Sequence, residues 1–331
     1  MRALLLCTVL GVFCAADARA RPCGAVPAPV RDIEANRYYV DAAGTIVDPA
    51  LKARKDVAVK PLKDFLRVVS GAADRYVASG DREAARCALD ALRFWAQGDA
   101  MLGKMSSRQA EYERNWMLAG VAMAYLKVKL NAAAGESKSI EAWLDRLAGE
   151  VRRFFDDPAR ARNNHYHWAA LAVGATAAGT GFQSHWEFAR QAFRDAAMAI
   201  QPDGTLPLEM ARQKKALWYH EFALAPLVVL AEIAARQGED WYSINDGAVR
   251  RLGARVLDGI AHPENFEQRT GYRQEGFEPG GLVGDILVWI EFYGRRFGDE
   301  EASRWLSAPR NYPQLGGDLA QLARRWIGDR E

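Results

Sequence analysis

The sequence predicts an all-α fold, and three observations favour it. Apolar residues recur at three- and four-residue spacing along nearly the whole chain, which is the period of an amphipathic helix. Short breakers such as "SGD", "AAGES", "QPDGTLP" and "RQGED" interrupt this pattern where helices are expected to end. No convincing run alternates polar and apolar residues as a half-buried strand does. Such helices, joined by short links, should pack as antiparallel hairpins in a bundle, a solenoid or a closed α/α toroid.

About ten helices are expected in chain order. Each has an apolar stripe, and they span residues 59–79, 81–98, 114–130, 139–155, 166–180, 185–200, 215–236, 246–260, 281–297 and 318–327. Two other stretches are poorly helical, since residues 36–57 are rich in turn residues and residues 262–281 form a long charged loop. Loops of this length inside a compact domain are usually lids or flexible connections.

The first twenty residues are expected to be an export signal rather than part of the fold. Arg2 supplies a basic start, an apolar run follows from Ala3 to Ala16, and "ARA" supplies a cleavage site after about Ala20. The apolar run is too short to span a membrane. We therefore expect a mature protein of residues 21–331, one domain, monomeric and without a membrane anchor, in the periplasm or secreted.

Cysteine content agrees with export. Cys7 and Cys14 leave with the signal, so Cys23 and Cys87 remain. Two cysteines in an oxidising compartment most simply form one disulfide, which here would tie the N-terminal arm to a helix start. Two unpaired thiols are the alternative.

The charge of the chain is close to neutral. The total is +2, and the leader carries two Arg and one Asp, which leaves +1 on the mature chain. Bulk charge therefore does not favour nucleic-acid binding. An anionic ligand would need a local cluster of Arg and Lys.

The stretch "RARNNHYHWAALAVGATAAGTG" starts at Arg160 and holds two of the five histidines. Asn163 or Asn164 is expected to cap the helix that follows, since Asn is a favoured N-cap. His165 would then lie in the first turn, where the positive end of the helix dipole favours its neutral form. A neutral imidazole is what a general base requires.

The stretch "LEMARQKKALWYHEFALAPL", residues 208–227, holds a second group of candidates. Arg212 and Tyr219 are seven residues apart, which on one helix places them on the same face. Arg212, Lys214 and Lys215 form a local positive patch, for which a solvated basic face is the usual explanation. Tyr219 lies between other aromatic residues and could equally belong to the core.

Several reaction classes are disfavoured by missing motifs. The chain contains no HExxH, GxSxG, P-loop or GxGxxG motif and no Cys/His spacing typical of a metal site. No pair of carboxylates stands out as a glycosidase would require. We therefore expect neither a metal nor another cofactor.

Taken together, "NNHYHW" and "ARQKKALWYHEFALAPL" resemble the paired signature of polysaccharide lyase family 5, the alginate lyases of the bacterial periplasm. The segments "RPCGAVPAPV", "ARCALDALRFWA", "RNWMLAGVAMAYLKVKL" and "LGGD" are also similar to that family, in the same order from about residue 23 to 318. The resemblance implies an incomplete α/α toroid with a long cleft. It also implies metal-independent β-elimination on an anionic polysaccharide.

The resemblance also assigns roles to residues. Asn164 and Arg212 would neutralise the substrate carboxylate, and Tyr219 would act as base and acid on sugars whose C5–H and O4 lie on one face. His165 would stabilise charge, or act as the base on epimers with the opposite geometry. Further residues are expected to contact substrate, namely Trp168, His167, Tyr38, Tyr39, Arg37, Tyr112, Arg114, His220 and Arg310.

His167, Trp218 and Glu221 depart from the residues usual in the alginate-specific members of that family. The expected substrates therefore extend from mannuronate-rich alginate to polyglucuronate and hyaluronan. Two alternatives remain open. One is a glycoside hydrolase on the same toroid, which would depend on carboxylates such as Glu209 or Asp203, and the other is a non-catalytic polysaccharide-binding protein.

Overall fold

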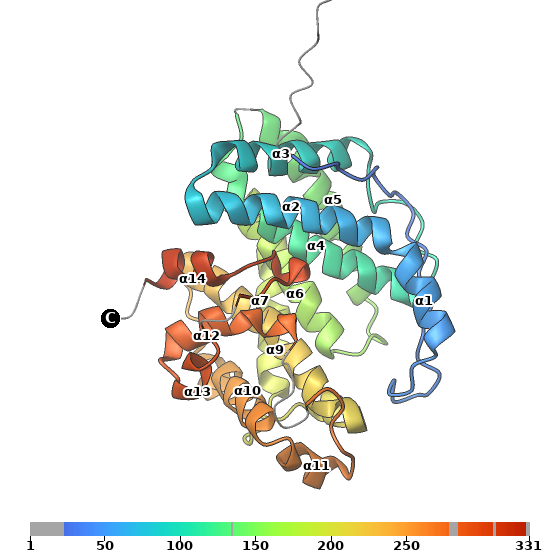
Figure 1. The fold of residues 1–331 in the computed structure, drawn as a ribbon, viewed down its shortest axis with the longest axis vertical. Coiled ribbons are helices and arrows are strands. Elements are labelled where there is room, and N and C mark those ends of the chain that lie inside the picture. The colour runs from blue at the N-terminus through green and yellow to red at the C-terminus, as the bar shows by residue number, and fades with distance from the viewer. Residues whose placement is uncertain (1–22, 134, 278–283, 307–308, 329–331) are drawn as a thin grey trace, which may run out of the picture.

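A computed structural model describes residues 23–133, 135–277, 284–306 and 309–328, and it confirms the all-α fold (Figure 1). No β-strand forms in these ranges, which contain only isolated bridges. The α-helices are α1 Pro49–Ala58, α2 Lys60–Ser79, α3 Arg82–Gln97, α4 Arg108–Val128, α5 Glu136–Phe155, α6 Asn164–Thr180, α7 Gln183–Ala199, α8 Pro207–Met210, α9 Ala216–Arg236, α10 Ile244–Ala261, α11 Glu264–Thr270, α12 Ile290–Phe297, α13 Glu300–Ser303 and α14 Ala320–Ile327. Short 3₁₀ turns lie at Lys129–Asn131, Gln213–Lys215, Asp285–Trp289 and Pro313–Leu315.

The predicted loops need two corrections. The stretch 36–57 contains most of α1, because Asp48 caps the helix by accepting the N–H of Leu51 and Pro49 starts its first turn. The stretch 262–281 contains α11. In addition, α4 begins six residues before the predicted start, because the Ser107 side chain accepts the N–H groups of Gln109 and Ala110.

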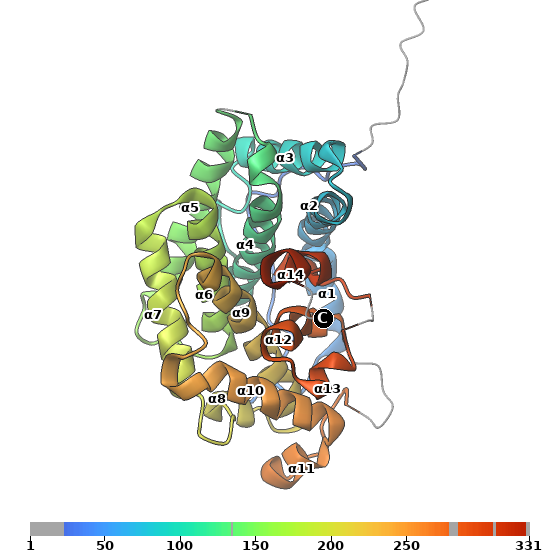
Figure 2. The same ribbon diagram turned by 90° about the vertical axis from the view of Figure 1, so that its left-hand side faces the viewer.

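Helices α4, α6 and α9 form the centre of the molecule. Helix α6 packs against α4, α7 and α9, and Figures 1 and 2 show α3 and α11 at opposite ends of the long axis. The contact is tight at Gly174, where a Cβ atom would lie 2.5 Å from Leu230 and 3.0 Å from Ala189. The small residues of α6 thus serve close helix packing.

Helix α9 contains Pro226, which has no N–H and therefore removes one hydrogen bond from the helix. The Phe222 carbonyl, four residues earlier, therefore lacks its helical partner and accepts instead from Trp168 Nε1 at 2.9 Å. His167 Nδ1 donates to the neighbouring Ala223 carbonyl at 3.2 Å. By length and composition the segment Gln213–Arg236 could cross a membrane, but 94% of its apolar window is buried inside the fold, as in a core helix.

Both ends of the described chain are tied to the helical core. The predicted disulfide is confirmed, and Cys23–Cys87 joins the N-terminal arm to α3. At the other end, buried Lys127 of α4 donates to the carbonyls of Gly316 and Asp318 at 2.7 and 2.9 Å. The segment "LGGD", residues 315–318, is therefore held against α4 by these hydrogen bonds. The predicted export signal lies outside the described residues.

Candidate active site

A cavity of about 360 Å³ lies where four segments of the chain meet. These are the hairpin at residues 37–44, the start of α4, the turn before α6, and the stretch from residue 212 into α9. The lining residues are Arg37, Tyr38, Tyr39, Ala42, Gly44, Arg108, Gln109, Tyr112, Trp116, Ala159, Arg160, Ala161, Asn163, His165, Arg212, Trp218, Tyr219 and Phe222. Among these described residues four are Arg and none is Asp or Glu, a composition that favours an anionic ligand.

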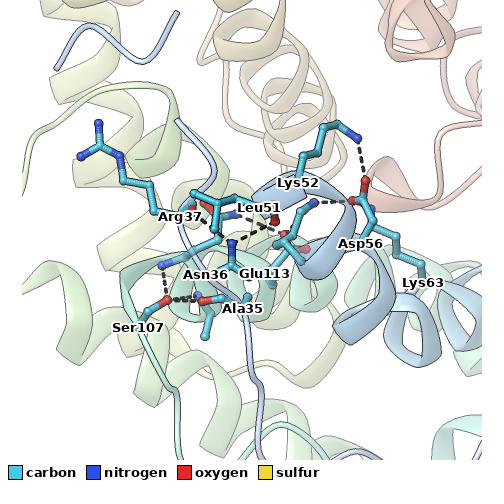
Figure 3. Close-up of polar contacts among 12 residues, drawn as sticks. Ala35, Asn36, Arg37, Leu51, Lys52, Asp56, Lys63, Ser107 and Glu113 are labelled. Atoms are coloured by element: carbon cyan, nitrogen blue, oxygen red, sulfur yellow. Dashed lines mark hydrogen bonds and ion pairs between the residues drawn. The ribbon is translucent and has the colours of Figure 1, made fainter. Parts of the chain in front are cut away.

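The hairpin over the cavity is anchored at its base, as Figure 3 shows. The Ala35 N–H donates to the Ser106 hydroxyl at 3.1 Å, and the Ser107 hydroxyl donates to the Ala35 carbonyl, both just before α4. Asn36 Nδ2 donates to the carbonyl of Leu51 in α1 at 2.9 Å. Buried Lys55 of α1 pairs with Glu113 of α4 at 3.6 Å. The hairpin therefore rests on two helices at its base, and residues of the 37–44 stretch, beyond that base, line the cavity.

His165 lies in the first turn of α6, which Asn163 caps by accepting the His165 N–H at 3.2 Å. The imidazole stacks on the Tyr112 ring, with centroids 3.5 Å apart and planes 5° apart. Burial is the main cause that lowers the pKa of His165, to about 3, and the positive charge of Arg212 is the second cause. The ring is therefore neutral at physiological pH, and its Nδ1 has no hydrogen-bond partner among the described residues.

Arg212 and Tyr219 are in direct contact. The guanidinium carbon lies 3.7 Å from the centre of the Tyr219 ring, and the Tyr219 hydroxyl donates to the Tyr39 hydroxyl at 3.1 Å. Burial raises the pKa of Tyr219 above its usual value, while the charge of Arg212 acts in the opposite direction. Arg212 also donates to the carbonyl of Gly44 at 3.1 Å. A Cβ at position 44 would lie 2.6 Å from the guanidinium, so only glycine allows this approach.

The two residues meet for a reason that the sequence did not predict. They are not on one helix, because α8 ends at Met210, a 3₁₀ turn follows, and α9 starts at Ala216. Gln213 has a φ of 53° in this break. The change in chain direction, rather than a seven-residue spacing along one face, brings Arg212 over Tyr219.

Asn164 is fully buried and faces Glu209 rather than the cavity. Its backbone N–H donates to Glu209 Oε1 at 2.8 Å, and its Nδ2 donates to Oε1 at 3.1 Å and Oε2 at 3.0 Å. Burial raises the pKa of Glu209 to about 7, although the bonds from Asn164 and the charge of Arg212 lower it. Of the predicted catalytic set, His165, Arg212 and Tyr219 thus line the cavity, and Asn164 lies behind its wall.

Several predicted substrate contacts lie away from the cavity, which corrects the expectation for them. His167 and Trp168 bond the α9 carbonyls near the proline and are at most 1% exposed. His220 is buried, and its Nε2 accepts the N–H of Leu206 at 2.9 Å while its Nδ1 donates within α9. Each of these polar rings thus bonds backbone groups inside the fold.

Two arginines that were predicted to contact substrate, Arg114 and Arg310, also do not line the cavity. Arg114 is 3% exposed and pairs with Glu111 on its own helix and with Glu150. Arg310 donates to the Trp305 carbonyl and does not line the cavity. By contrast Arg37, Tyr38, Tyr39 and Tyr112 do line it, as predicted.

Some lining residues were not predicted, namely Arg108, Gln109, Arg160 and Phe222. Arg160 stands five residues before His165, and Phe222 three residues after Tyr219, so sequence proximity was the available signal. Arg108 and Gln109 stand four and three residues before Tyr112, another predicted contact, so the same signal was available for them. In the described part of the chain no group of His, Cys, Asp and Glu side chains is arranged to hold a metal ion.

Comparison with known proteins gives the family of the chain. The alginate lyase family model matches residues 32–266, which is more than half of the sequence. The chain belongs to the alginate lyase family. A polysaccharide lyase of Stenotrophomonas maltophilia is 41% identical over 310 residues and 92% of each chain. An alginate lyase of Pseudomonas syringae pv. syringae is 34% identical, over 91% of this chain and 82% of the relative.

Solved structures of alginate lyase A1-III are also similar. The enzyme from Sphingomonas species A1 has a TM-score of 0.78 at 26% identity, covering 90% of this chain and 85% of its own. A tyrosine-to-phenylalanine variant complexed with a tetrasaccharide has a TM-score of 0.81 at 25% identity, covering 93% of this chain and 86% of that chain. The predicted incomplete α/α toroid is thereby confirmed, and this member of the alginate lyase family is a polysaccharide lyase.

Proposed function

We propose that the protein cleaves β-1,4-linked polyuronates by β-elimination, without a metal, and that mannuronate-rich alginate, polyglucuronate and hyaluronan are its substrate class. The observation that carries this proposal is the meeting of His165, Arg212 and Tyr219 in a cavity lined by four Arg and, among its described residues, no carboxylate. An anionic sugar chain fits that charge. A pair of acidic groups, which glycoside hydrolysis requires, is missing from this lining.

The first task of the site is to make the proton on C5 removable. That proton lies beside a carboxylate, whose negative charge opposes formation of a carbanion. Arg212 offers a fixed positive charge to the carboxylate. Asn164 would add an amide hydrogen bond once its Nδ2, which donates to Glu209 in this structure, turns toward the substrate. Groups aimed in advance at developing charge stabilise the enolate-like state more than the ground state.

The second task is proton transfer. Tyr219, as the phenolate, takes the C5 proton and passes it to O4, so the C5–H and C4–O4 bonds break, a C4=C5 double bond forms and the phenolate is restored. This assignment suits mannuronate and glucuronate, in which both groups lie on one face of the ring. The Tyr219 pKa is raised by burial, and Arg212 at 3.7 Å favours the phenolate that must form. His165, neutral because its pKa is lowered to about 3, stays beside the reacting carbon as a polar group without added charge.

Ultraviolet absorbance of the new C=C–carboxylate group tests the proposal. The native protein is mixed with polymannuronate, polyguluronate, polyglucuronate and hyaluronan. Absorbance should rise with at least one of polymannuronate, polyglucuronate and hyaluronan. New reducing ends without absorbance would mean hydrolysis, and no product from any polymer would favour a binding protein.

We also infer that the protein acts outside the cytoplasm. The first twenty residues have the composition of an export signal, and a disulfide persists best in an oxidising compartment. Fractionation of an expressing bacterium, followed by mass measurement, tests this. The periplasmic fraction should contain a chain that begins near Arg21.

A further inference from the structure

A buried carboxyl group stands directly behind the Asn164 amide. Glu209 is 1% exposed, and both of its oxygens accept hydrogen bonds from Asn164. An ionised carboxylate can only accept hydrogen bonds, so it holds the amide with Nδ2 turned toward it. The other amide atom, Oδ1, is then buried without a partner among the described residues.

This orientation does not suit an anionic ligand. A substrate carboxylate that meets the Asn164 amide on the side away from Glu209 would face Oδ1, and two acceptors repel one another. A half-turn of the amide would present Nδ2 to the substrate instead. That rotation places Oδ1 against Glu209, where it needs a hydrogen-bond donor, and only the protonated carboxyl group is one.

We propose that Glu209 is a positioning residue that couples the binding of an anionic substrate to the uptake of one proton. In the free protein, ionised Glu209 holds Nδ2 of Asn164. In the complex, Glu209 Oε2–H donates to Oδ1, Oε1 still accepts the Asn164 backbone N–H, and Nδ2 donates to the substrate carboxylate. The proton comes from solvent and no covalent bond of the substrate changes. The inference rests on the proposed function, because it takes a uronate carboxylate as the ligand of Asn164.

The surroundings of Glu209 allow this exchange near neutral pH. Burial raises the pKa of Glu209 to about 7, against the opposing effects of the Asn164 hydrogen bonds and the nearby charge of Arg212. A bound substrate adds a negative charge to the same region, which raises the pKa of a carboxyl group further. Burial and the negative charge of the substrate thus both favour the protonated form of Glu209 in the complex.

Among the other titratable groups at this end of α6 and α9, burial raises the pKa of Glu221 to about 8, so the Glu209→Gln control below is what assigns the proton to Glu209. Burial raises the pKa of Tyr219 above its usual value, and the binding measurement below replaces this residue by phenylalanine, so it adds no proton there. Burial also lowers the pKa values of the nearby imidazoles to about 3 or 4, which keeps all of them neutral, namely His165, His167 and His220. Glu209 is the titrating group that bonds the Asn164 amide, so its titration is the one expected to accompany binding.

Calorimetric titration of Tyr219→Phe with an oligomer of the polyuronate that the native protein cleaves measures the proton directly. The binding heat is compared in two buffers of different ionisation enthalpy, because the difference counts protons. Uptake should approach one proton per site at about pH 8 and approach zero at about pH 6, and affinity should fall by up to about tenfold per pH unit above pH 7. No uptake at the higher pH, or no binding of any polyuronate, would overturn the inference.

The matched control is Glu209→Gln in the same Tyr219→Phe background. Glutamine can donate to Oδ1 at every pH, so it imitates the protonated carboxyl group. Its complex should form without proton uptake and with an affinity that does not change with pH. A merely structural role would lower thermal stability and affinity but leave the proton count unchanged, which would contradict the inference. If the double variant does not fold, the pH dependence of uptake in Tyr219→Phe decides alone.

Failure of the proposed function is recognised separately. It is read from the native protein, as the absence of unsaturated product on every polymer. The proton count is read from binding to a variant in which elimination is not required. A lyase that binds without taking up a proton would keep the proposed function and lose only this inference.

Discussion

The two motifs that build the cavity each have a cavity side and a core side, only one or two residues apart. In "NNHYHW", His165 lines the cavity, whereas His167 and Trp168 are buried below it. In "LWYHEF", Tyr219 lines the cavity and His220, its neighbour, is buried. Polar and aromatic side chains one or two positions apart thus either line the cavity or support the core.

The core-side residues are defined by the backbone groups that they bond. Trp168 satisfies the Phe222 carbonyl that Pro226 leaves without a helical donor, and His167 bonds the next carbonyl, that of Ala223. His220 accepts the N–H of Leu206 at the start of α8. The cavity-side residues instead contact other side chains, such as Tyr112 and Arg212. Substitutions on the two sides should therefore affect different measurements, activity on one side and stability on the other.

The largest effect is expected from Tyr219→Phe on the cavity side. The substitution removes the hydroxyl that transfers the proton, and kcat should fall by about 10²- to 10⁴-fold, the range for a general acid or base. The initial rate of absorbance increase measures kcat, and the urea midpoint measures stability, which should change little. Tyr272→Phe, at an exposed position, is the control. A normal rate in Tyr219→Phe would remove tyrosine from the mechanism.

Trp168→Phe on the core side should show the opposite pattern. It leaves the Phe222 carbonyl buried without a donor, which costs about 1–3 kcal/mol of unfolding free energy. Urea unfolding measures this loss, and kcat per folded molecule should stay within about twofold. Trp218→Phe, at a tryptophan that lines the cavity, is the matched comparison. If Trp168→Phe lowered kcat as much as Trp218→Phe does, the distinction between the two sides would fail.

Stability should fall as pH rises from about 7 to 8.5, a range above the ordinary pKa of histidine, so the buried neutral imidazoles no longer add a rise with pH. Burial raises the pKa of Glu209 to about 7 and that of Glu221 to about 8. A carboxyl group that binds its proton more tightly in the folded state stabilises the fold below its ordinary pKa, and this stability is lost as pH rises through the folded-state value. Each group can contribute a slope of at most about 1.4 kcal/mol per pH unit. Unfolding at several pH values measures the slope.

The pH series has a clear control. Glu221→Gln removes the group with the higher pKa, so the decrease between about pH 7.5 and 8.5 should become shallower. Glu209→Gln should flatten the lower part of the range. A stability that rose with pH across this window would contradict the assignment of both groups.

The smallest effect is expected from Tyr39→Phe in the hairpin. The substitution removes the oxygen that accepts the Tyr219 hydroxyl hydrogen at 3.1 Å. A neutral hydrogen bond contributes about 0.5–1.5 kcal/mol, so kcat/KM should fall by up to about tenfold. Tyr38→Phe in the same hairpin is the control, and it should change kcat/KM less. Equal effects of the two would mean that the hairpin acts as a whole and not through this contact.

Sequence reasoning predicted the main helices because their apolar periodicity is strong. It missed α1, α8, α11 and α13, which are short or begin in turn-rich stretches where capping decides the outcome. The resemblance to the alginate lyase family, rather than periodicity, placed Asn164, His165, Arg212 and Tyr219 in one site. Sequence reasoning could not separate cavity side from core side, because α6 and α9 are buried on nearly all faces and carry no polar stripe that marks direction.

The orientation of Asn164 was also beyond sequence reasoning. Either asparagine of the pair could cap α6, and only the folded chain shows that Asn163 does so. The partner of Asn164 is 45 residues away, on the short helix α8. Long-range contacts of this kind depend on the whole fold and leave no local pattern.

The proline of α9 has a consequence for how this family can vary. Without an N–H at position 226, the Phe222 carbonyl depends on an indole from another helix, 54 residues away in sequence. Replacement of the proline by an ordinary residue would restore the helical bond and leave Trp168 Nε1 without its acceptor. Loss of the tryptophan alone would orphan the carbonyl. The two positions are therefore expected to change together among relatives, as an inherited pair, while Tyr219 can stay fixed whichever pair a lineage carries.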